Sequence, residues 1–576
     1  MNATESNGVA ARDAPEPRRP PAWVAVIALS AATWATFGHL AGNDLMFDDL
    51  DTIRQNRTIA SLRNLGILFS KDYFAATDEY SYRPVVTASY FLDHAIAGKR
   101  PWIYHVHNVV LHHANVLLVF ALFALLGAGR WCAFAIAMVF ALHPLHTSAV
   151  IFPGFREDLQ MTLGMLAMAC CLTADRRRPA AGWIVGAAVA LGYALLAKEG
   201  ALLLPVAWLV WDAVEGRRTQ RFAALARRYG PLGLVWLSYI AIRFFIMTNP
   251  AAAELDVIEV LPVGQRVLTA PYLFAYYLGR FVWPLPLCII HEVDPLEGIG
   301  TAFILSLVAV GVSGAIWIVL AVRARWLWPA GLWAAAAFAP VSNLYPIVNL
   351  WAERFYYSVG VGAAAIAVGA AVAAWGFLVP RRPQSRRGLA VAGFGAVVFL
   401  GGMAAVCDAI RGLECRTALG LWRATVRRVP DSGFALIDLA VCEIEAGNFD
   451  RAIDAATRAE PLPGGGTYRS AYVAGQAYFR QGLWREAIAH FERALPHDPP
   501  SIENQANLLA LLATACFETG QRVVAADRMQ HALKLDPQNP AARRLQRRLE
   551  AVKNGDRLLI LPETDRQAPS QRPRNK

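Results

Sequence analysis

Two neighbouring carboxylates follow the first apolar run of the chain and could act as a general base. Asp48 and Asp49 come after residues 22–41, in the segment NDLMFDDLDTIRQN. A carboxylate just beyond a membrane helix reaches the membrane surface and still contacts water. One carboxylate of such a pair could take the proton from an acceptor hydroxyl while its neighbour or a nearby cation sets its pKa. The alternative is that these acidic residues are only the solvated segment that follows the first helix.

Four cations are candidates for phosphate binding near the same membrane surface. Each stands at a predicted end of an apolar run, and they are Arg83, Arg156, Lys198 and Arg354. A reaction in which a phosphate is the leaving group needs cations or a metal to stabilise the phosphate charge more than it needs a general acid. Arginine suits bidentate phosphate contact, and lysine suits a point-charge contact. The alternative for each cation is a snorkelling anchor.

A histidine-rich stretch, YHVHNVVLHH, supplies a third polar group. His105 and His112 are seven residues apart on one helical face, Asn108 lies between them at the i+3 position, and His107 adjoins them. These groups form a candidate polar cluster inside a helix bundle. A divalent metal is one interpretation and hydrogen-bonded histidine is the other, because the spacing fixes no carboxylate partner. We therefore assign no metal ligands and no cofactor.

The elements that carry these residues belong to a membrane protein. The 576 residues are 56% hydrophobic and only 17% charged, with a mean hydropathy of +0.34. Apolar runs of roughly 17 to 25 residues recur as far as residue 407, and each could cross a bilayer core of about 30 Å. The net charge of +11 lies largely in short loops, so it indicates orientation and not nucleic-acid binding. The pattern predicts an all-α, polytopic bundle.

The positions of the arginine-rich loops predict how the chain crosses the membrane. We expect about eleven spans, near 22–41, 105–127, 130–149, 157–174, 181–197, 200–214, 230–247, 301–322, 327–344, 355–378 and 389–407. Residues 266–287 are broken by prolines and Arg280, so they are expected to form an interfacial or re-entrant element. The N-terminus is then cytoplasmic, and the loop 43–104 and the C-terminal part are external. The compact, arginine-rich loops favour a bacterial inner membrane.

The C-terminal part contains repeats. Its middle unit has the spacing of a tetratricopeptide repeat, at Gly475, Tyr478, Gly482, Trp484, Ala487, Phe491, Ala494 and Pro499. Such units stack into a short α-solenoid that binds protein segments. We therefore predict four regions: a disordered cytoplasmic segment 1–21, a membrane domain 22–411, a tetratricopeptide domain 412–552 and a disordered tail 553–576.

Six segments in order, followed by the repeats, resemble one known family. It is the tetratricopeptide-containing O-mannosyltransferase-like membrane proteins of the GT-C glycosyltransferase superfamily. The segments are FDDLDTIRQN, YRPVVTASYFLD, YHVHNVVLHH, ALHPLHTSAVIFPGFREDLQMTL, AKEGALLLP and PVSNLYPIVNLWAERFYYSVG. The order of all six carries the resemblance, because no single one is specific.

The resemblance implies roles for the candidate residues. Asp48 or Asp49 would be catalytic, and six residues would lie near the donor phosphate or brace the loops: Arg83, Arg156, Asp158, Lys198, Glu353 and Arg354. Glu157 departs from the family, which more often has a small residue between the Arg and the Asp. The repeats are also few, which bears on the choice of acceptor.

These expectations lead to one function and two alternatives. The expected function is a membrane glycosyltransferase that moves mannose or a similar hexose from a polyprenyl-phosphate donor, with inversion, to a protein Ser/Thr or another hydroxyl on the external face. Its partners would be the lipid-linked sugar, an acceptor protein or glycan held by the repeats, and the bilayer, with no nucleic acid. One alternative is a non-catalytic, membrane-anchored tetratricopeptide scaffold for envelope assembly. The other is a transporter of lipid-linked sugars, which the position of the charges at span ends argues against.

Overall fold

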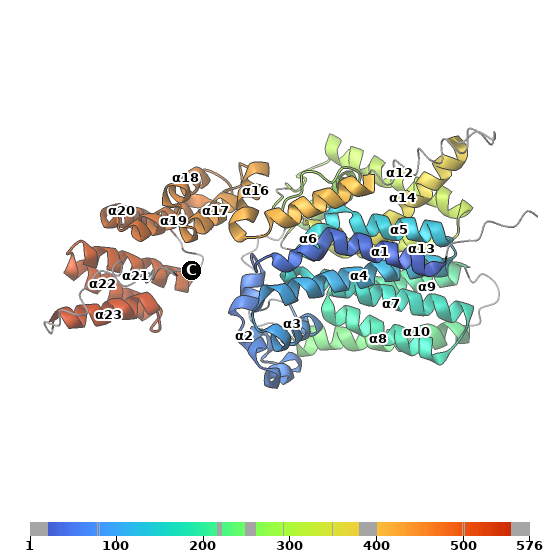
Figure 1. Ribbon diagram of the computed structural model, residues 1–576, viewed down its shortest axis with the longest axis horizontal. Helices are drawn as coiled ribbons and strands as arrows, with labels where there is room; N and C mark the ends of the chain where they lie inside the picture. The colour runs from blue at the N-terminus through green and yellow to red at the C-terminus, as the bar shows by residue number, and fades with distance from the viewer. Residues whose placement is uncertain are drawn as a thin grey trace, which may run out of the picture.

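The computed structural model describes residues 21–77, 79, 81–215, 222–247, 261–291, 293–347, 349–378, 400–497, 499 and 501–553. Within these residues every regular element is a helix. A bundle of long helices is followed by a smaller set of short antiparallel helices at one end (Figure 1). The predicted disordered ends, the loops around Arg217 and Arg381, and most of the predicted span 389–407 lie outside the described residues.

The bundle contains most of the long helices. They are α1 (Ala22–Phe37), α4 (Pro101–Leu126), α5 (Arg130–Leu142), α7 (Arg156–Arg177), α8 (Ala181–Ala197), α9 (Leu204–Glu215), α10 (Phe222–Ala241), α11 (Val263–Val282), α12 (Thr301–Arg323), α13 (Leu327–Phe338) and α14 (Tyr356–Leu378). Short helices form the loop after α1, namely η1 (Gly38–Gly42), η2 (Leu50–Gln55), η3 (Thr58–Ala60), η4 (Leu62–Phe69), α2 (Tyr73–Thr77) and α3 (Pro84–Ala97). Others join the long helices, namely η5 (Pro144–His146), α6 (Thr147–Ile151), η6 (Pro153–Phe155), η7 (Glu199–Leu203), η8 (Ile242–Ile246), η10 (Ala339–Val341) and η11 (Glu353–Phe355).

Fewer helices than expected are long and apolar enough to cross a membrane. Among the described residues four qualify, at 22–42, 101–126, 301–323 and 353–377, and a pair bent by 53° at residues 130–151 would make a fifth. The prediction of about eleven spans is therefore wrong. Two apolar runs fold into helices that are shorter than predicted, since α9 and α13 have 12 residues each. The helix α8 has the predicted bounds but only 17 residues. A helix of 12 residues is only about 18 Å long. The segment predicted as interfacial, 266–287, lies mainly in α11, which is not among the four.

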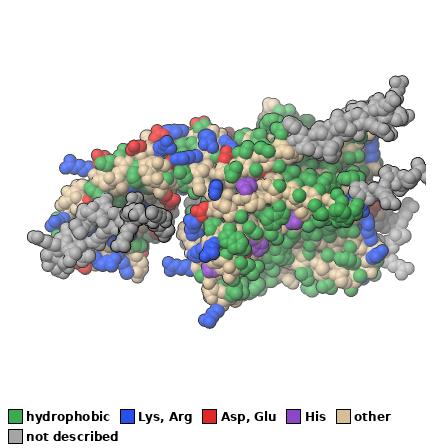
Figure 2. Space-filling model, in the orientation of Figure 1, with side chains coloured by type: hydrophobic (Ala, Val, Ile, Leu, Met, Phe, Trp, Pro, Cys, Tyr) green, Lys and Arg blue, Asp and Glu red, His purple; other side chains and the backbone are tan. Residues whose placement is uncertain are grey.

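The outer side of the bundle is apolar. Only 11% of the apolar stretch of α12 is buried, and its exposed side chains include Leu305, Val308 and Val312. Hydrophobic side chains cover the long face of the bundle, whereas Lys and Arg gather at its two ends (Figure 2). An apolar surface of this extent is unusual for a protein surrounded by water. This surface is suited to lipid contact.

The two ends of the bundle differ in chemistry. At one end the arginine-rich loops form buried ion pairs: Arg176 lies 3.2 Å from Asp212, and Arg228 lies 2.9 Å from Asp175 and 2.8 Å from Asp212. These contacts join the last turn of α7 to α9 and α10. The loop after α1 and the C-terminal helices lie at the other end (Figure 1).

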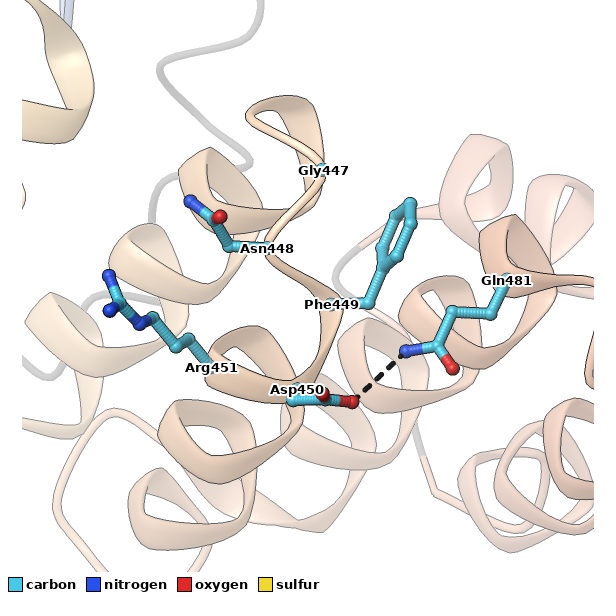
Figure 3. A pocket seen from close by; sticks show the side chains of 6 residues that line it. All are labelled: Gly447, Asn448, Phe449, Asp450, Arg451 and Gln481. Atoms are coloured by element: carbon cyan, nitrogen blue, oxygen red, sulfur yellow. Dashed lines mark hydrogen bonds between the residues drawn. The ribbon is translucent and has the colours of Figure 1, made fainter.

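The C-terminal helices form a solenoid of antiparallel pairs. They are α16 (Ala418–Arg428), α17 (Gly433–Glu445), α18 (Phe449–Ala459), α19 (Gly466–Gln481), α20 (Trp484–Ala494), α21 (Ile502–Glu518), α22 (Arg522–Leu535) and α23 (Pro540–Lys553). Small residues allow the close packing, since a Cβ at Gly475 would lie 2.6 Å from the ring of Phe491. A hollow lies where the turn between α17 and α18 meets the end of α19, and a 3.4 Å hydrogen bond from Gln481 to Asp450 crosses it (Figure 3).

Candidate functional site

The two neighbouring carboxylates have different surroundings. Asp49 is fully buried, and its two oxygens accept hydrogen bonds from the backbone amides of Gly154, at 2.6 Å, and of Met46, at 3.1 Å. Asp48 is exposed. Gly154 packs against both, because a Cβ there would lie 3.1 Å from the Cβ of Asp48 and 3.1 Å from Oδ1 of Asp49. Asp49 therefore holds the loop on the bundle, while Asp48 is the carboxylate that solvent can reach.

Burial and nearby charges both change the pKa values of these two carboxylates. Neighbouring protein atoms desolvate Asp48 and raise its pKa, and the positive charge of Arg354 opposes part of that rise. Full burial raises the pKa of Asp49 to about 7, although its hydrogen bonds to backbone amides favour the ionised form. A raised pKa makes a carboxylate a stronger base, which is the property that a proton acceptor needs.

Arg83 and Lys198, two of the three predicted cations that are paired with carboxylates, belong to one network. Arg83, just before α3, lies 3.2 Å from Glu157. The buried Nζ of Lys198, at the end of α8, lies 2.7 Å from Asp158 and 3.7 Å from Glu157. Glu157 therefore joins Arg83 to Lys198, and the residue that departs from the family pattern is the centre of this ion-pair network.

Arg354 differs from the other cations in the site. Its guanidinium stacks on the ring of Phe155 at 4.0 Å and on that of Phe355 at 5.0 Å. Nζ of Lys198 lies 5.3 Å from the same Phe355 ring, so the two cations are neighbours. Among the described residues, Arg354 has no hydrogen bond or ion pair to a carboxylate. Its donors are available to a ligand with negative charge.

Arg156 occupies the interior of the bundle. It is fully buried, and it donates to Oδ1 of Asn108 at 2.8 Å, to Ser89 at 2.9 Å and to the carbonyl of Tyr104 at 2.9 Å. It also forms a 2.6 Å ion pair with Asp93. Because these partners use most of its donors, Arg156 braces the segments around it and does not face the exposed Asp48.

The histidine-rich stretch is hydrogen-bonded to the bundle. His105 contacts the carbonyls of Ile151, at 3.0 Å, and Asp44, at 3.3 Å. His112 contacts the hydroxyl of Tyr357 and the carbonyl of Ala141. Asn108 donates to the carbonyls on either side of Ile151, and His107 turns to Asp93, 2.7 Å away. The described residues contain no group of three or more His, Cys, Asp and Glu side chains that could hold a metal ion.

Glu353 points away from the cations, although it adjoins Arg354 in η11. Its buried carboxylate accepts a 2.6 Å hydrogen bond from the backbone amide of Cys288 and lies 3.3 Å from Nε2 of His291. It therefore fixes the segment after α11 against η11.

Two acidic residues that shape the site were not among the predicted site residues. Glu199 follows Lys198 and lies 3.9 Å from Arg83. Glu79 accepts hydrogen bonds from the hydroxyls of Tyr73 and Thr87, and burial raises its pKa to about 7. Tyr73 in turn accepts from the backbone amide of Arg83 at 3.2 Å. The adjacency of Glu199 to Lys198 was a usable signal, whereas nothing in the sequence distinguished Glu79.

The structure thus brings together five of the predicted residues, namely Asp48, Arg83, Asp158, Lys198 and Arg354, with Asp49 directly behind Asp48. The exposed carboxylate could accept a proton while the guanidinium of Arg354, which no described carboxylate pairs with, stabilises an anionic leaving group. Arg156, Glu353 and the histidine-rich stretch lie outside this group and hold its supporting elements.

Comparison with known proteins finds similar sequences for both parts of the chain. The Tetratricopeptide repeat family profile matches residues 403–466 and 472–540, in the solenoid and the helix before it. Protein O-mannosyl-transferase TMTC2 of Mus musculus is 32% identical over 201 residues, which are 33% of this chain and 24% of that protein. A protein O-mannosyl-transferase of Caenorhabditis elegans is 25% identical over 349 residues, 56% of this chain and 47% of that protein. Over these segments the chain is similar in sequence to protein O-mannosyl-transferases.

The similarity covers only part of each related protein. The chain covers about a quarter of the length of the mouse protein O-mannosyl-transferase and less than half of the nematode one. Among solved structures, the chain is similar to ArnT from Cupriavidus metallidurans bound to undecaprenyl phosphate, with 16% identity, a TM-score of 0.39 and coverage of 84% of this chain and 82% of that one. That TM-score is too low to establish a common fold. The resemblance to protein O-mannosyl-transferases that the sequence predicted is confirmed, together with the tetratricopeptide repeats.

Proposed function

We propose that this chain is a membrane glycosyltransferase that moves mannose or a similar hexose from a polyprenyl-phosphate donor to a hydroxyl group, such as that of a protein Ser or Thr. One observation carries the proposal: the exposed Asp48 packs against Gly154, and Arg354, which stacks on the adjacent Phe155, has no carboxylate partner among the described residues. Both lie at the end of an apolar bundle, where a lipid-linked donor and a water-soluble acceptor could meet. The names of the related proteins favour mannose as the sugar.

The transfer is a single displacement at the anomeric carbon. The acceptor oxygen attacks this carbon as its proton passes to the carboxylate of Asp48, and the bond from carbon to the phosphate oxygen breaks. The electron pair of that bond stays with the polyprenyl phosphate, which leaves as an anion. Attack from the face opposite the phosphate inverts the anomeric centre. Arg354 stabilises the charge that develops on the leaving phosphate.

The other residues have supporting roles in this proposal. Lys198 and Arg83 are largely neutralised by Glu157, Asp158 and Glu199, so they hold the cluster together and add positive charge at its edge. Asp49, Arg156 and Glu353 brace the loops, as do the histidine-rich contacts. The solenoid, at the same end of the bundle, presents the acceptor protein or glycan.

The different chemistry of the two ends of the bundle also suggests how the protein is oriented in the membrane. We propose that the arginine-rich end faces the cytoplasm together with the N-terminus, and that Asp48 and the solenoid face the opposite, external side. The bacterial inner membrane remains our proposed location, with an undecaprenyl-type donor. The separation of Arg176 and Arg228 from the acidic loop by the length of α7, about 33 Å for 22 residues, supports this orientation.

The test compares envelope glycoproteins from a deletion strain complemented with the wild type or with Asp48→Asn, at matched abundance. Mass spectrometry should find a hexose on Ser or Thr that the wild type restores and the variant does not. In nanodiscs, the purified wild-type protein should release polyprenyl phosphate from a synthetic polyprenyl-phosphate mannose, and the purified Asp48→Asn variant should not. Full activity of Asp48→Asn in both assays would refute the proposed role of Asp48. If the variant also rescued every phenotype of the deletion, the non-catalytic scaffold would be the better explanation.

A further inference from the structure

One side chain of the acidic loop packs against both bodies of the protein. The ring of Phe47 lies 6.4 Å from that of Phe152 and 6.1 Å from that of Phe155, on the bundle side. The same ring lies 6.0 Å from that of Trp422, in the first helix of the solenoid. Phe47 is thus a partly buried member of the packing around the bundle core and around the first solenoid core.

Hydrogen bonds attach the acidic loop to the junction between the two bodies. The buried side-chain amide of Asn43 donates to the carbonyls of Gly412, at 3.0 Å, and Cys415, at 2.9 Å. The backbone amide of Asp44 donates to the carbonyl of Arg416 at 3.1 Å. These carbonyls belong to the end of the helix at residues 400–414 and the turn that leads into α16, which lies between the bundle and the rest of the solenoid (Figure 1).

The position of Phe47 bears directly on the reacting groups. Its φ angle is +55°, a left-handed conformation that bulky residues rarely adopt, so surrounding contacts must maintain it. The next residue is Asp48. The ring of Phe155, which contacts Phe47, also carries the guanidinium of Arg354 at 4.0 Å. A single aromatic cluster therefore connects Trp422 of the solenoid with Arg354 and with the residue that precedes Asp48.

We propose that Phe47 is a positioning residue which, through its contact with Trp422, makes the placement of Asp48 and Arg354 depend on the position of the solenoid. This inference rests on the proposed glycosyl transfer and deepens it. An acceptor that binds the solenoid would stabilise the arrangement of α16 in which Asp48 is correctly placed. The solenoid would then affect the rate of transfer as well as acceptor binding.

The experiment uses the full chain in nanodiscs with polyprenyl-phosphate mannose and compares Trp422→Ala, Trp422→Phe and Phe434→Ala with the wild type. Phe434 is a matched control, because it is a half-exposed aromatic residue of α17 that packs on Arg469. A misplacement of about 1 Å can reduce turnover by up to about 100-fold, so Trp422→Ala should lower kcat by about tenfold or more with the donor KM nearly unchanged. Trp422→Phe should restore most of kcat, and Phe434→Ala should have no effect.

Hydrogen exchange gives a second readout that does not depend on turnover. Backbone amides of residues 44–50 should exchange faster in Trp422→Ala than in the wild type, with no change in Phe434→Ala. If Trp422→Ala does not fold, Phe47→Leu, which leaves α16 intact, should give the same kcat loss and the same faster exchange. Wild-type kcat, or wild-type exchange at residues 44–50, in the folded variant would overturn the coupling. A wild-type protein that transfers no sugar would instead refute the proposed function, and the exchange rates would then decide the coupling alone.

Discussion

Oδ1 of Asp49 accepts a 2.6 Å hydrogen bond from the backbone amide of Gly154, which connects the loop after α1 to η6 of the bundle. The contact gives two adjacent carboxylates different tasks. Asp49 uses both oxygens on backbone amides, whereas Asp48, one residue earlier, remains exposed to solvent. The residue that fixes the loop is therefore not the residue that is free to accept a proton.

Asp49→Asn should destabilise the protein more than Asp48→Asn does. The asparagine would place an NH2 group against one of the two amides that Asp49 now satisfies, and an unsatisfied buried donor costs about 1–3 kcal/mol. Asp48 has no comparable buried partner. Thermal unfolding of the two variants in the same detergent should give a lower Tm for Asp49→Asn and a Tm close to the wild type for Asp48→Asn. Equal Tm values for the two variants would contradict this division.

Gly154→Ala should reduce transfer with little loss of stability. The new methyl group would lie 3.1 Å from Cβ of Asp48 and 3.1 Å from Oδ1 of Asp49, so both carboxylates must shift by a few tenths of an ångström. Gly66→Ala, in η4 of the same loop, is the control because its new methyl group would have no neighbour within 4 Å. Steady-state kinetics should show a lower kcat for Gly154→Ala and wild-type values for Gly66→Ala.

Lys198→Met and Arg354→Gln should separate a structural cation from a functional one. Loss of Lys198 leaves Asp158 and Glu157 buried without their 2.7 and 3.7 Å partner, and breaking such a buried pair costs about 3–5 kcal/mol. Arg354 has aromatic contacts but no carboxylate partner among the described residues. We therefore expect a clear fall in Tm and activity for Lys198→Met, and a fall in activity alone for Arg354→Gln.

A double variant extends this comparison. Asp158→Asn should recover part of the stability that Lys198→Met loses, because it removes one unpaired buried charge, and a thermodynamic cycle over the pair would measure the interaction. Additive Tm changes would show that the 2.7 Å contact contributes little.

The sequence predicted local features better than contacts between distant segments. The spacing of Gly475 and Phe491 within one repeat predicted the packing of α19 and α20, because both lie within a single unit. Arg156, by contrast, pairs with Asp93, 63 residues earlier, and no local pattern connects the two. The same limit applies to Asp48 and Asp49, which are indistinguishable until Gly154 is placed beside them. The number of spans failed for another reason: hydropathy does not show that apolar runs such as those of α9 and α13 fold into helices of only 12 residues, about 18 Å long.

The pH dependence of transfer should report the charge of Arg354. Desolvation raises the pKa of Asp48 above its ordinary value of 3.8, and Glu157 and Asp51 add to the rise, while Arg354 and Arg83 oppose it. Since the base acts in its ionised form, activity should fall on acidification through a pKa above 3.8. Removing a positive charge raises that pKa further. Arg354→Gln should therefore move the acid limb of kcat/KM to higher pH.

Arg354→Lys is the matched control for this shift, because it keeps the charge and loses the planar stacking on Phe155. Its residual activity should fall off at the same pH as that of the wild type. The maximal rate of a variant does not change the pH at which its activity falls. A low rate in either variant therefore still permits the comparison. An acid limb that stays in place when the charge at position 354 is removed would mean that Asp48 is not the group whose ionisation controls transfer.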